Sequence, residues 1–142
     1  RVFPGAVDFG ALEHRKLYRI KLSLLNAGVG YSKFRIRQPK SSMVSVVYSP
    51  AAVASGMSVS LEVEVACTSL GRVDDALHVL SEEGSFPVPI TARVVSADEY
   101  NRWEIEGGVH PPDMRVVDTL PMGHTLKATR GQKAASGGGG DM

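Results

Sequence analysis

Cysteine is nearly absent from this 142-residue sequence, and its one cysteine, Cys67, has no partner for an internal disulfide. Glycosylation signals are absent as well, because neither Asn26 nor Asn101 lies in an Asn-x-Ser/Thr sequence. Disulfides are common in secreted domains, so both absences favour an intracellular location. No apolar run approaches the roughly 18 residues of a membrane-spanning helix. The formal net charge of +1 gives no reason to expect a nucleic acid as the partner.

Patterns that carry catalysis are also missing. The four histidines are scattered, and none has the spacing of a metal-ligand pair. Cys67 lacks the histidine signature that accompanies a nucleophilic cysteine. No glycine-rich loop joins a strand to a helix in the manner of a phosphate-binding site. We therefore expect no enzyme activity, no cofactor and no bound metal.

What the sequence does contain is a repeated alternation of apolar and polar residues. Tyr18, Ile20, Leu22 and Leu24 fall on one side of a stretch whose other side is mostly polar, which is the pattern of a half-buried β-strand. The turn-forming residues 26–28 follow. The same alternation predicts about seven strands, over residues 6–10, 17–25, 33–37, 43–48, 57–66, 73–80 and 86–95.

Short strands joined by turns, with almost no helical periodicity before residue 96, predict an all-β fold. We expect an immunoglobulin-like antiparallel β-sandwich. The antibody type is not expected, because it would have two cysteines and a core tryptophan in this segment. Pro87 and Pro89 share one face of the last predicted strand and have no N–H to donate. That strand is therefore expected at a sheet edge, where prolines prevent unwanted pairing.

The charges are unevenly distributed along the chain. Every charged residue from 15 to 40 is basic, and every one from 62 to 83 except Arg72 is acidic. Two interpretations are open. In the first, Arg19 and Lys21 face Glu62 and Glu64 across neighbouring strands, and the charges set strand register and solubility. In the second, basic side chains form a surface for an acidic partner such as a tubulin or nucleic-acid surface; these are Lys33, Arg35, Arg37 and Lys40.

The character of the sequence changes after residue 95. Ser96 and Glu99 have capping-box spacing, and Tyr100 and Trp103 lie at i and i+3, which predicts a short helix over residues 97–106. So short a helix needs a docking surface. Two are open: its own sandwich, or a neighbouring protein that Tyr100 and Trp103 would contact. Residues 109–121 are expected to be extended.

Beyond Met122 the polar, glycine-rich sequence predicts a flexible linker. We therefore expect two parts, a sandwich over residues 1–95 and a C-terminal segment over residues 96–142. The chain begins with Arg1 and ends in this linker, so we expect a fragment of a longer protein.

Several short motifs follow one another between residues 3 and 95: Phe3-Pro-Gly-Ala-Val-Asp-Phe-Gly10, Asn26-Ala-Gly28, Tyr48-Ser-Pro50, Gly56-Met-Ser58 and Gly71. Their order and spacing resemble the ASPM/SPD-2/hydin (ASH) domain. That family is an immunoglobulin-like sandwich related to the major sperm protein and PapD-like folds. The resemblance gives Phe9 a place in the core and Gly10 the bend after the first strand. It does not extend to the residues after 95.

The resemblance implies a non-enzymatic assembly module of a ciliary, flagellar or centrosomal protein, especially a hydin-like component of the axonemal central apparatus. It implies other axonemal proteins, microtubules and neighbouring domains of the same chain as partners. The alternative, which rests on the strand pattern alone, is an extracellular adhesion or carbohydrate-binding sandwich. The missing glycosylation signals and cysteine pairs count against that alternative.

Overall fold

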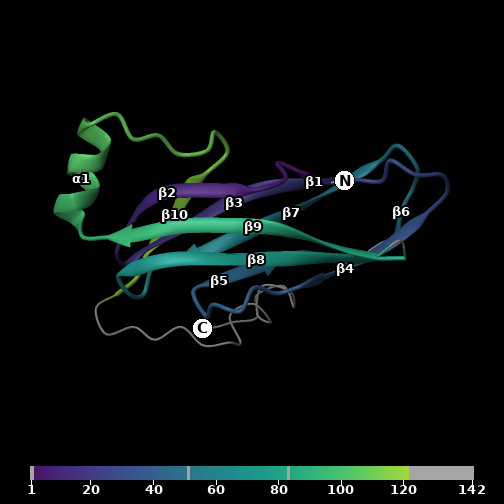
Figure 1. The fold of residues 1–142 in the computed structure, drawn as a ribbon, viewed down its shortest axis with the longest axis horizontal. Coiled ribbons are helices and arrows are strands. Elements are labelled where there is room, and N and C mark those ends of the chain that lie inside the picture. Colours follow the sequence, from purple (N-terminus) through teal and green to yellow (C-terminus); the bar gives the residue numbers. More distant parts are fainter. Residues whose placement is uncertain (1, 51, 83, 122–142) are drawn as a thin grey trace.

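The computed structural model describes residues 2–50, 52–82 and 84–121, and the predicted flexible linker beyond Met122 lies outside the described residues. Two β-sheets pack face to face, and a short helix lies at one end of the long axis (Figure 1). The predicted all-β sandwich is therefore confirmed.

Each sheet has five strands. The first sheet has the order β1-β3-β7-β5, and β10 also pairs with β3; its members are β1 (Val2–Phe3), β3 (Lys16–Leu25), β5 (Val44–Val47), β7 (Ser58–Ala66) and β10 (Arg115–Thr119). The second sheet has the order β2-β9-β8-β4-β6, formed by β2 (Val7–Glu13), β4 (Ser32–Arg37), β6 (Ala52–Val53), β8 (Gly71–Ser81) and β9 (Gly84–Val95). Pairing is antiparallel except between β2 and β9, which are parallel.

The core lies between the sheets and follows the predicted alternation. In β3 the side chains of Tyr18, Ile20, Leu22 and Leu24 are buried, and residues from β2, β7, β8 and β9 meet them in one cluster. Phe9 is fully buried there, as the resemblance implies. The predicted strands all form, whereas β1, β6 and β10 are additional. Each of these short strands is held by pairing with a distant strand, which local alternation does not reveal.

The position of β9 corrects one expectation. This strand is not a sheet edge, because it lies between β2 and β8. However, β2 reaches β9 only from Ile90 onward, so the half of β9 that contains Pro87 and Pro89 pairs with β8 alone. Both prolines therefore lie where one side of the strand is unpaired, and there a missing N–H disrupts no ladder.

Glu64 departs from the alternation of its strand. Its strand position predicts an exposed side chain, but the residue is only 3% exposed. Arg19 explains the burial, because its guanidinium donates to Glu64 at 2.9 Å and to Glu62 at 3.2 Å. The register pairs Arg19 with Glu64 and Lys21 with Glu62, as predicted.

The segment after β9 connects the two sheets. Helix α1 (Ala97–Ile105) begins after Ser96, whose hydroxyl accepts a hydrogen bond from the backbone N–H of Glu99 at 3.3 Å, as the capping box predicts. The helix lies against β2 of the second sheet, and the chain then crosses to the first sheet and pairs with β3 as β10 (Figure 1).

Candidate functional site

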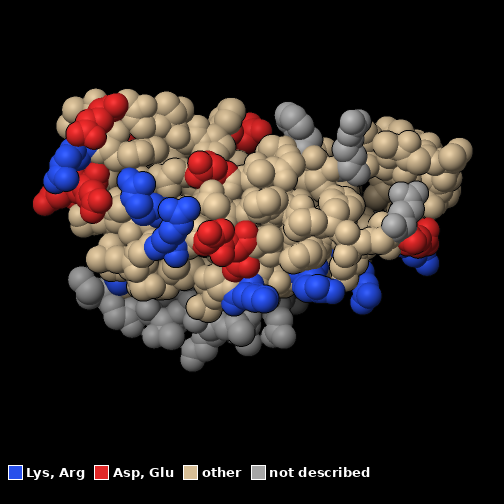
Figure 2. All heavy atoms as spheres, in the orientation of Figure 1, with Lys and Arg blue, Asp and Glu red and all other residues tan. Residues whose placement is uncertain are grey.

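Strand β4 presents three of the predicted cations on the outer face of the second sheet. Phe34 and Ile36 are 6% and 7% exposed and anchor the strand in the core. The alternate residues Lys33, Arg35 and Arg37 therefore point outward and are exposed. Lys40 is exposed in the connection that follows. Figure 2 shows a row of basic side chains along the edge of the molecule where Figure 1 places β4.

These β4 cations differ from the cations of the first sheet in their pairing. On the first sheet, Arg19 bridges Glu62 and Glu64, and Arg115 binds Glu62 at 3.0 Å. Within the described ranges, none of the β4 cations or Lys40 forms a salt bridge. The first interpretation of the charges therefore accounts for Arg19, and it leaves the basic row on β4 without a structural role.

Asp75 fixes the turn that carries Lys40. Its carboxylate accepts hydrogen bonds from the backbone N–H groups of Lys40, Ser41 and Ala76 at 3.2, 2.7 and 2.8 Å. Burial alone would raise the pKa of Asp75, but these donors and the charge of Lys40 outweigh it, so the pKa lies below its ordinary value. The carboxylate is thus used to hold the turn.

A groove of about 540 Å³ runs beside the β4 cations. We call it the β4 groove. Phe34, Pro50 and Leu80 supply apolar walls, and Lys33 and Arg35 supply charge. An apolar depression next to unpaired charges has the composition of a protein-interaction surface, in which an apolar centre is surrounded by a polar rim.

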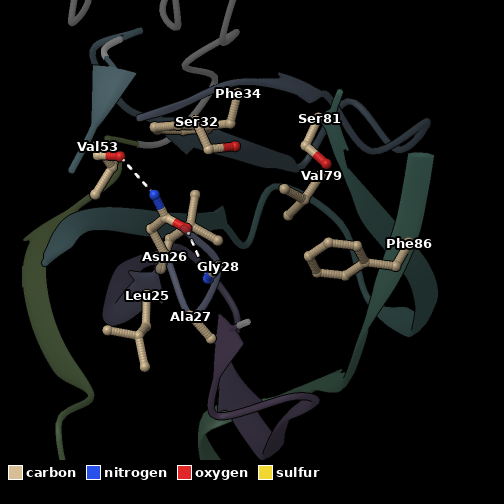
Figure 3. Close-up of a pocket in the computed structure, with 11 residues that line it drawn as sticks. Leu25, Asn26, Ala27, Gly28, Ser32, Phe34, Val53, Val79, Ser81 and Phe86 are labelled. Atoms are coloured by element: carbon tan, nitrogen blue, oxygen red, sulfur yellow. Dashed lines mark hydrogen bonds between the residues drawn. The ribbon is translucent and has the colours of Figure 1, made fainter. Parts of the chain in front are cut away.

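A second depression opens at the end of the sandwich opposite α1. This end pocket has a volume of about 280 Å³ and lies between the ends of β3, β4, β6, β8 and β9. Figure 3 shows Asn26 on one side of the pocket, with Val79 and Phe86 on the other. Val53 and Val79 are buried and supply apolar walls, whereas Asn26, Ser32 and Ser81 supply polar ones.

Asn26 has a larger role than the sequence predicts. Its side-chain oxygen accepts a hydrogen bond from the backbone N–H of Gly28 at 3.0 Å, which forms the predicted turn. Its amide nitrogen also donates to the carbonyl oxygen of Gly30 at 2.8 Å and to that of Val53 at 2.7 Å, the second of which Figure 3 shows. The residue therefore ties β6 to the β3–β4 connection and shapes the wall of the end pocket.

Tyr100 and Trp103 lie at the opposite end of the molecule and contact their own sandwich. Their ring centroids are 5.9 Å apart, and the ring of His110 lies 5.8 Å from Tyr100 and 4.9 Å from Trp103. His110 also makes a 2.8 Å hydrogen bond from Nε2 to the carbonyl oxygen of Ala11 in β2. Of the two docking surfaces open to the helix, the structure therefore shows the helix on its own sandwich.

The predicted site residues thus form two separate groups. The β4 cations and the aromatic pair lie toward opposite edges of the second sheet, because β8 and β9 separate β4 from β2. His110 belongs to the aromatic group, but no spacing pattern in the sequence indicates this, because its partners come from β2, β3 and α1. In the described residues, no cluster of His, Cys, Asp and Glu is suited to a metal ion. None of the described helices is long and apolar enough to cross a membrane.

A model of the flagellar-associated PapD-like family matches residues 1–95. Among solved structures, the chain is similar to the ASH/PapD-like domain 7 of human CEP192, with a TM-score of 0.60, 10% identity, and coverage of 68% of this chain and 85% of that one. It is also similar to SSP-19, an MSP-domain protein of Caenorhabditis elegans, with a TM-score of 0.50, 13% identity, and coverage of 65% and 97%.

A Porphyromonas gingivalis protein of unknown function has a TM-score of 0.57 and 17% identity, and the match covers 68% of this chain and 48% of that one. At identities this low, the three solved structures support the fold alone.

Proposed function

Since the chain belongs to the flagellar-associated PapD-like family, we propose that it is a non-enzymatic protein-interaction module of a ciliary or flagellar protein. The finer proposal is that this module helps to assemble the axoneme, with central-apparatus proteins or microtubules as partners. The proposed binding surface is the β4 groove together with Lys33, Arg35, Arg37 and Lys40.

One observation carries this proposal. The β4 cations are exposed and form no salt bridge with any described residue, while an apolar groove runs directly beside them. An acidic partner such as tubulin would neutralise these charges and cover the groove, so that charge complementarity and apolar burial would act together. Tyr100 and Trp103 are left out of the surface, because their rings are used to dock α1.

The location is tested on the intact parent protein in isolated axonemes. We expect its peptides to remain after detergent extraction and to be released by high salt, because contacts between exposed charges are screened by salt. Mass spectrometry of the two extracts measures this. Loss of the peptides into the detergent extract would contradict an axonemal role.

The surface is tested by charge reversal. The triple variant Lys33→Glu, Arg35→Glu, Arg37→Glu is expected to fold normally, because all three side chains are exposed, and to lose binding to microtubules in co-sedimentation at low salt. The matched control reverses three exposed cations elsewhere on the molecule, Arg72, Arg93 and Arg102, and changes the net charge equally.

The control variant should bind like the wild type. If both variants lose binding to the same extent, net charge rather than the β4 surface governs the interaction. If neither variant loses binding, the β4 surface is not the site.

A further inference from the structure

Exposed apolar side chains gather at both ends of the sandwich. At the α1 end, Ile105 and Val109 are 84% and 80% exposed. At the opposite end, Val29 and Tyr31 in the β3–β4 connection are 99% and 75% exposed, and Met57, which accepts a backbone hydrogen bond from Asn26, is 59% exposed. A single exposed apolar residue is ordinary. Exposed apolar residues at both ends of the long axis give each end a candidate contact surface.

The end pocket opens to solvent, and its polar lining includes Ser32, which follows Tyr31, and Asn26, whose backbone N–H donates to the carbonyl oxygen of Met57. Its inner walls come from Leu24, Val53 and Val79, which are buried. An apolar cavity of about 150 Å³ holds a benzene molecule. The pocket, at about 280 Å³, therefore has room for one aliphatic side chain of the size of isoleucine.

The two ends also carry opposite charges. Helix α1 and its C-cap expose one basic residue, Arg102, and four acidic residues: Asp98, Glu99, Glu104 and Glu106. At the pocket end, Lys33 and Arg35 lie beside the β4 groove with Glu82, and neither cation forms a salt bridge within the described ranges. The acidic helix and the basic groove are therefore complementary in sign.

We propose that the α1 end of one copy of this chain docks onto the pocket end of a second copy, with Ile105 as the apolar anchor in the end pocket. The two surfaces differ and lie at opposite ends of the molecule, so the contact is heterologous and repeats head to tail. One anchor and a few exposed charges make a small interface. We expect a dissociation constant of roughly tens to hundreds of micromolar, which rises with salt concentration.

This inference goes beyond the proposed function, because it concerns a contact between copies rather than an axonemal partner. Its test changes only apolar residues and leaves every β4 cation in place. A chain that self-associates without binding microtubules would contradict only the proposed function. A chain that binds microtubules without self-associating would contradict only this inference.

The test is sedimentation equilibrium of the 142-residue chain. One variant, Ile105→Ser with Val109→Ser, removes the α1-end surface, and another, Tyr31→Ser with Met57→Ser, removes the pocket-end surface. Each variant should weaken association by about tenfold or more. An equimolar mixture of the two variants should form heterodimers but no longer chains, because each pair retains one intact surface of each kind.

The control variant, Val116→Ser with Val117→Ser, changes two exposed apolar residues on β10 and should associate like the wild type. Circular dichroism checks that all the variants fold. A wild-type chain that stays monomeric up to about 1 mM at low salt overturns the proposal. So does a mixture of the two end variants that fails to associate, because the intact α1 end of one variant should still bind the intact pocket end of the other.

Discussion

Trp103, the only tryptophan, packs against the backbone of two glycines, Gly10 and Gly108. Its indole occupies the space that a side chain at either position would need. A Cβ atom at Gly10 would lie 2.8 Å from Cζ2 of the indole, and one at Gly108 would also collide with the ring. Gly10 in addition has a φ of +74°, which residues with a side chain rarely adopt. The absence of a side chain at both glycines therefore leaves room for the indole, which packs α1 against β2.

The first prediction compares two glycines with the same backbone conformation. Gly30 has a φ of +76° and no atom within 4 Å of an added Cβ, so Gly30→Ala carries only the conformational cost, about 1 kcal/mol. Gly10→Ala carries that cost and also displaces Trp103, so we expect a loss of about 2–4 kcal/mol. Urea unfolding measures both values.

The emission of Trp103 provides a second readout of the same pair. It should shift to longer wavelength in native Gly10→Ala and stay unchanged in Gly30→Ala, because only the first substitution forces the indole toward water. Equal stability losses and unchanged spectra in both variants would show that the indole does not depend on Gly10.

At the scale of elements, side chains and short segments protect the edges of the sheets. The outer strand β5 is covered by Gln38, whose side chain donates to the carbonyl oxygen of Val46 at 3.0 Å and accepts from its N–H at 2.8 Å. These are the hydrogen bonds that an additional strand would make. On the other side of the molecule, β10 pairs with β3, and His110 bonds to β2. Partners are therefore expected on the faces and ends of the sandwich.

The second prediction concerns the attachment of β10. The residues of this strand are all exposed, and the buried contact that follows it is Leu120, which packs on Leu17 and Ala66. Leu120→Ala should therefore loosen β10 and cost about 2–3 kcal/mol, the lower part of the range for a buried leucine because the site lies at the rim of the fold.

Hydrogen exchange distinguishes this effect from general destabilisation. In Leu120→Ala the amides of β10 and of the β3 residues that pair with it should lose protection, while those of β8 stay protected. Val116→Ala, at a position that is 54% exposed on β10, is the control and should leave both stability and protection unchanged. Uniform loss of protection across all strands in Leu120→Ala would contradict the prediction.

At the scale of the whole molecule, the segment after residue 95 is joined to both sheets. Helix α1 contacts β2, and β10 pairs with β3, with Arg115 bound to Glu62 of β7. The third prediction is that the described part of the chain unfolds in one cooperative transition. Trp103 fluorescence and far-ultraviolet circular dichroism should then give the same midpoint in urea. An earlier fluorescence transition would instead support a separate unit at residues 1–95.

Sequence alternation predicts which side of a strand faces the core, and this is why the faces of β3 and β4 follow the expected pattern. It does not predict which strands are neighbours. The position of β9 inside its sheet, the burial of Glu64 and the pairing of β10 all depend on neighbours, so the pattern misses them.

The same distinction applies to the candidate site. The exposure of Lys33, Arg35 and Arg37 follows from alternation, whereas the β4 groove and the end pocket are built by residues from several strands. The docking of Trp103 likewise depends on Gly10, which is distant in the sequence.

The pairing of β2 with β9 determines when β2 can take its final position during synthesis on the ribosome. Val7 pairs with Ile90 and Glu13 with Val95, so β2 has no permanent place until the whole of β9 has been synthesised. At about 5–20 residues per second, that delay lasts on the order of seconds. Throughout it, Phe9 and Leu12, which are fully buried in the finished molecule, stay open to chaperones.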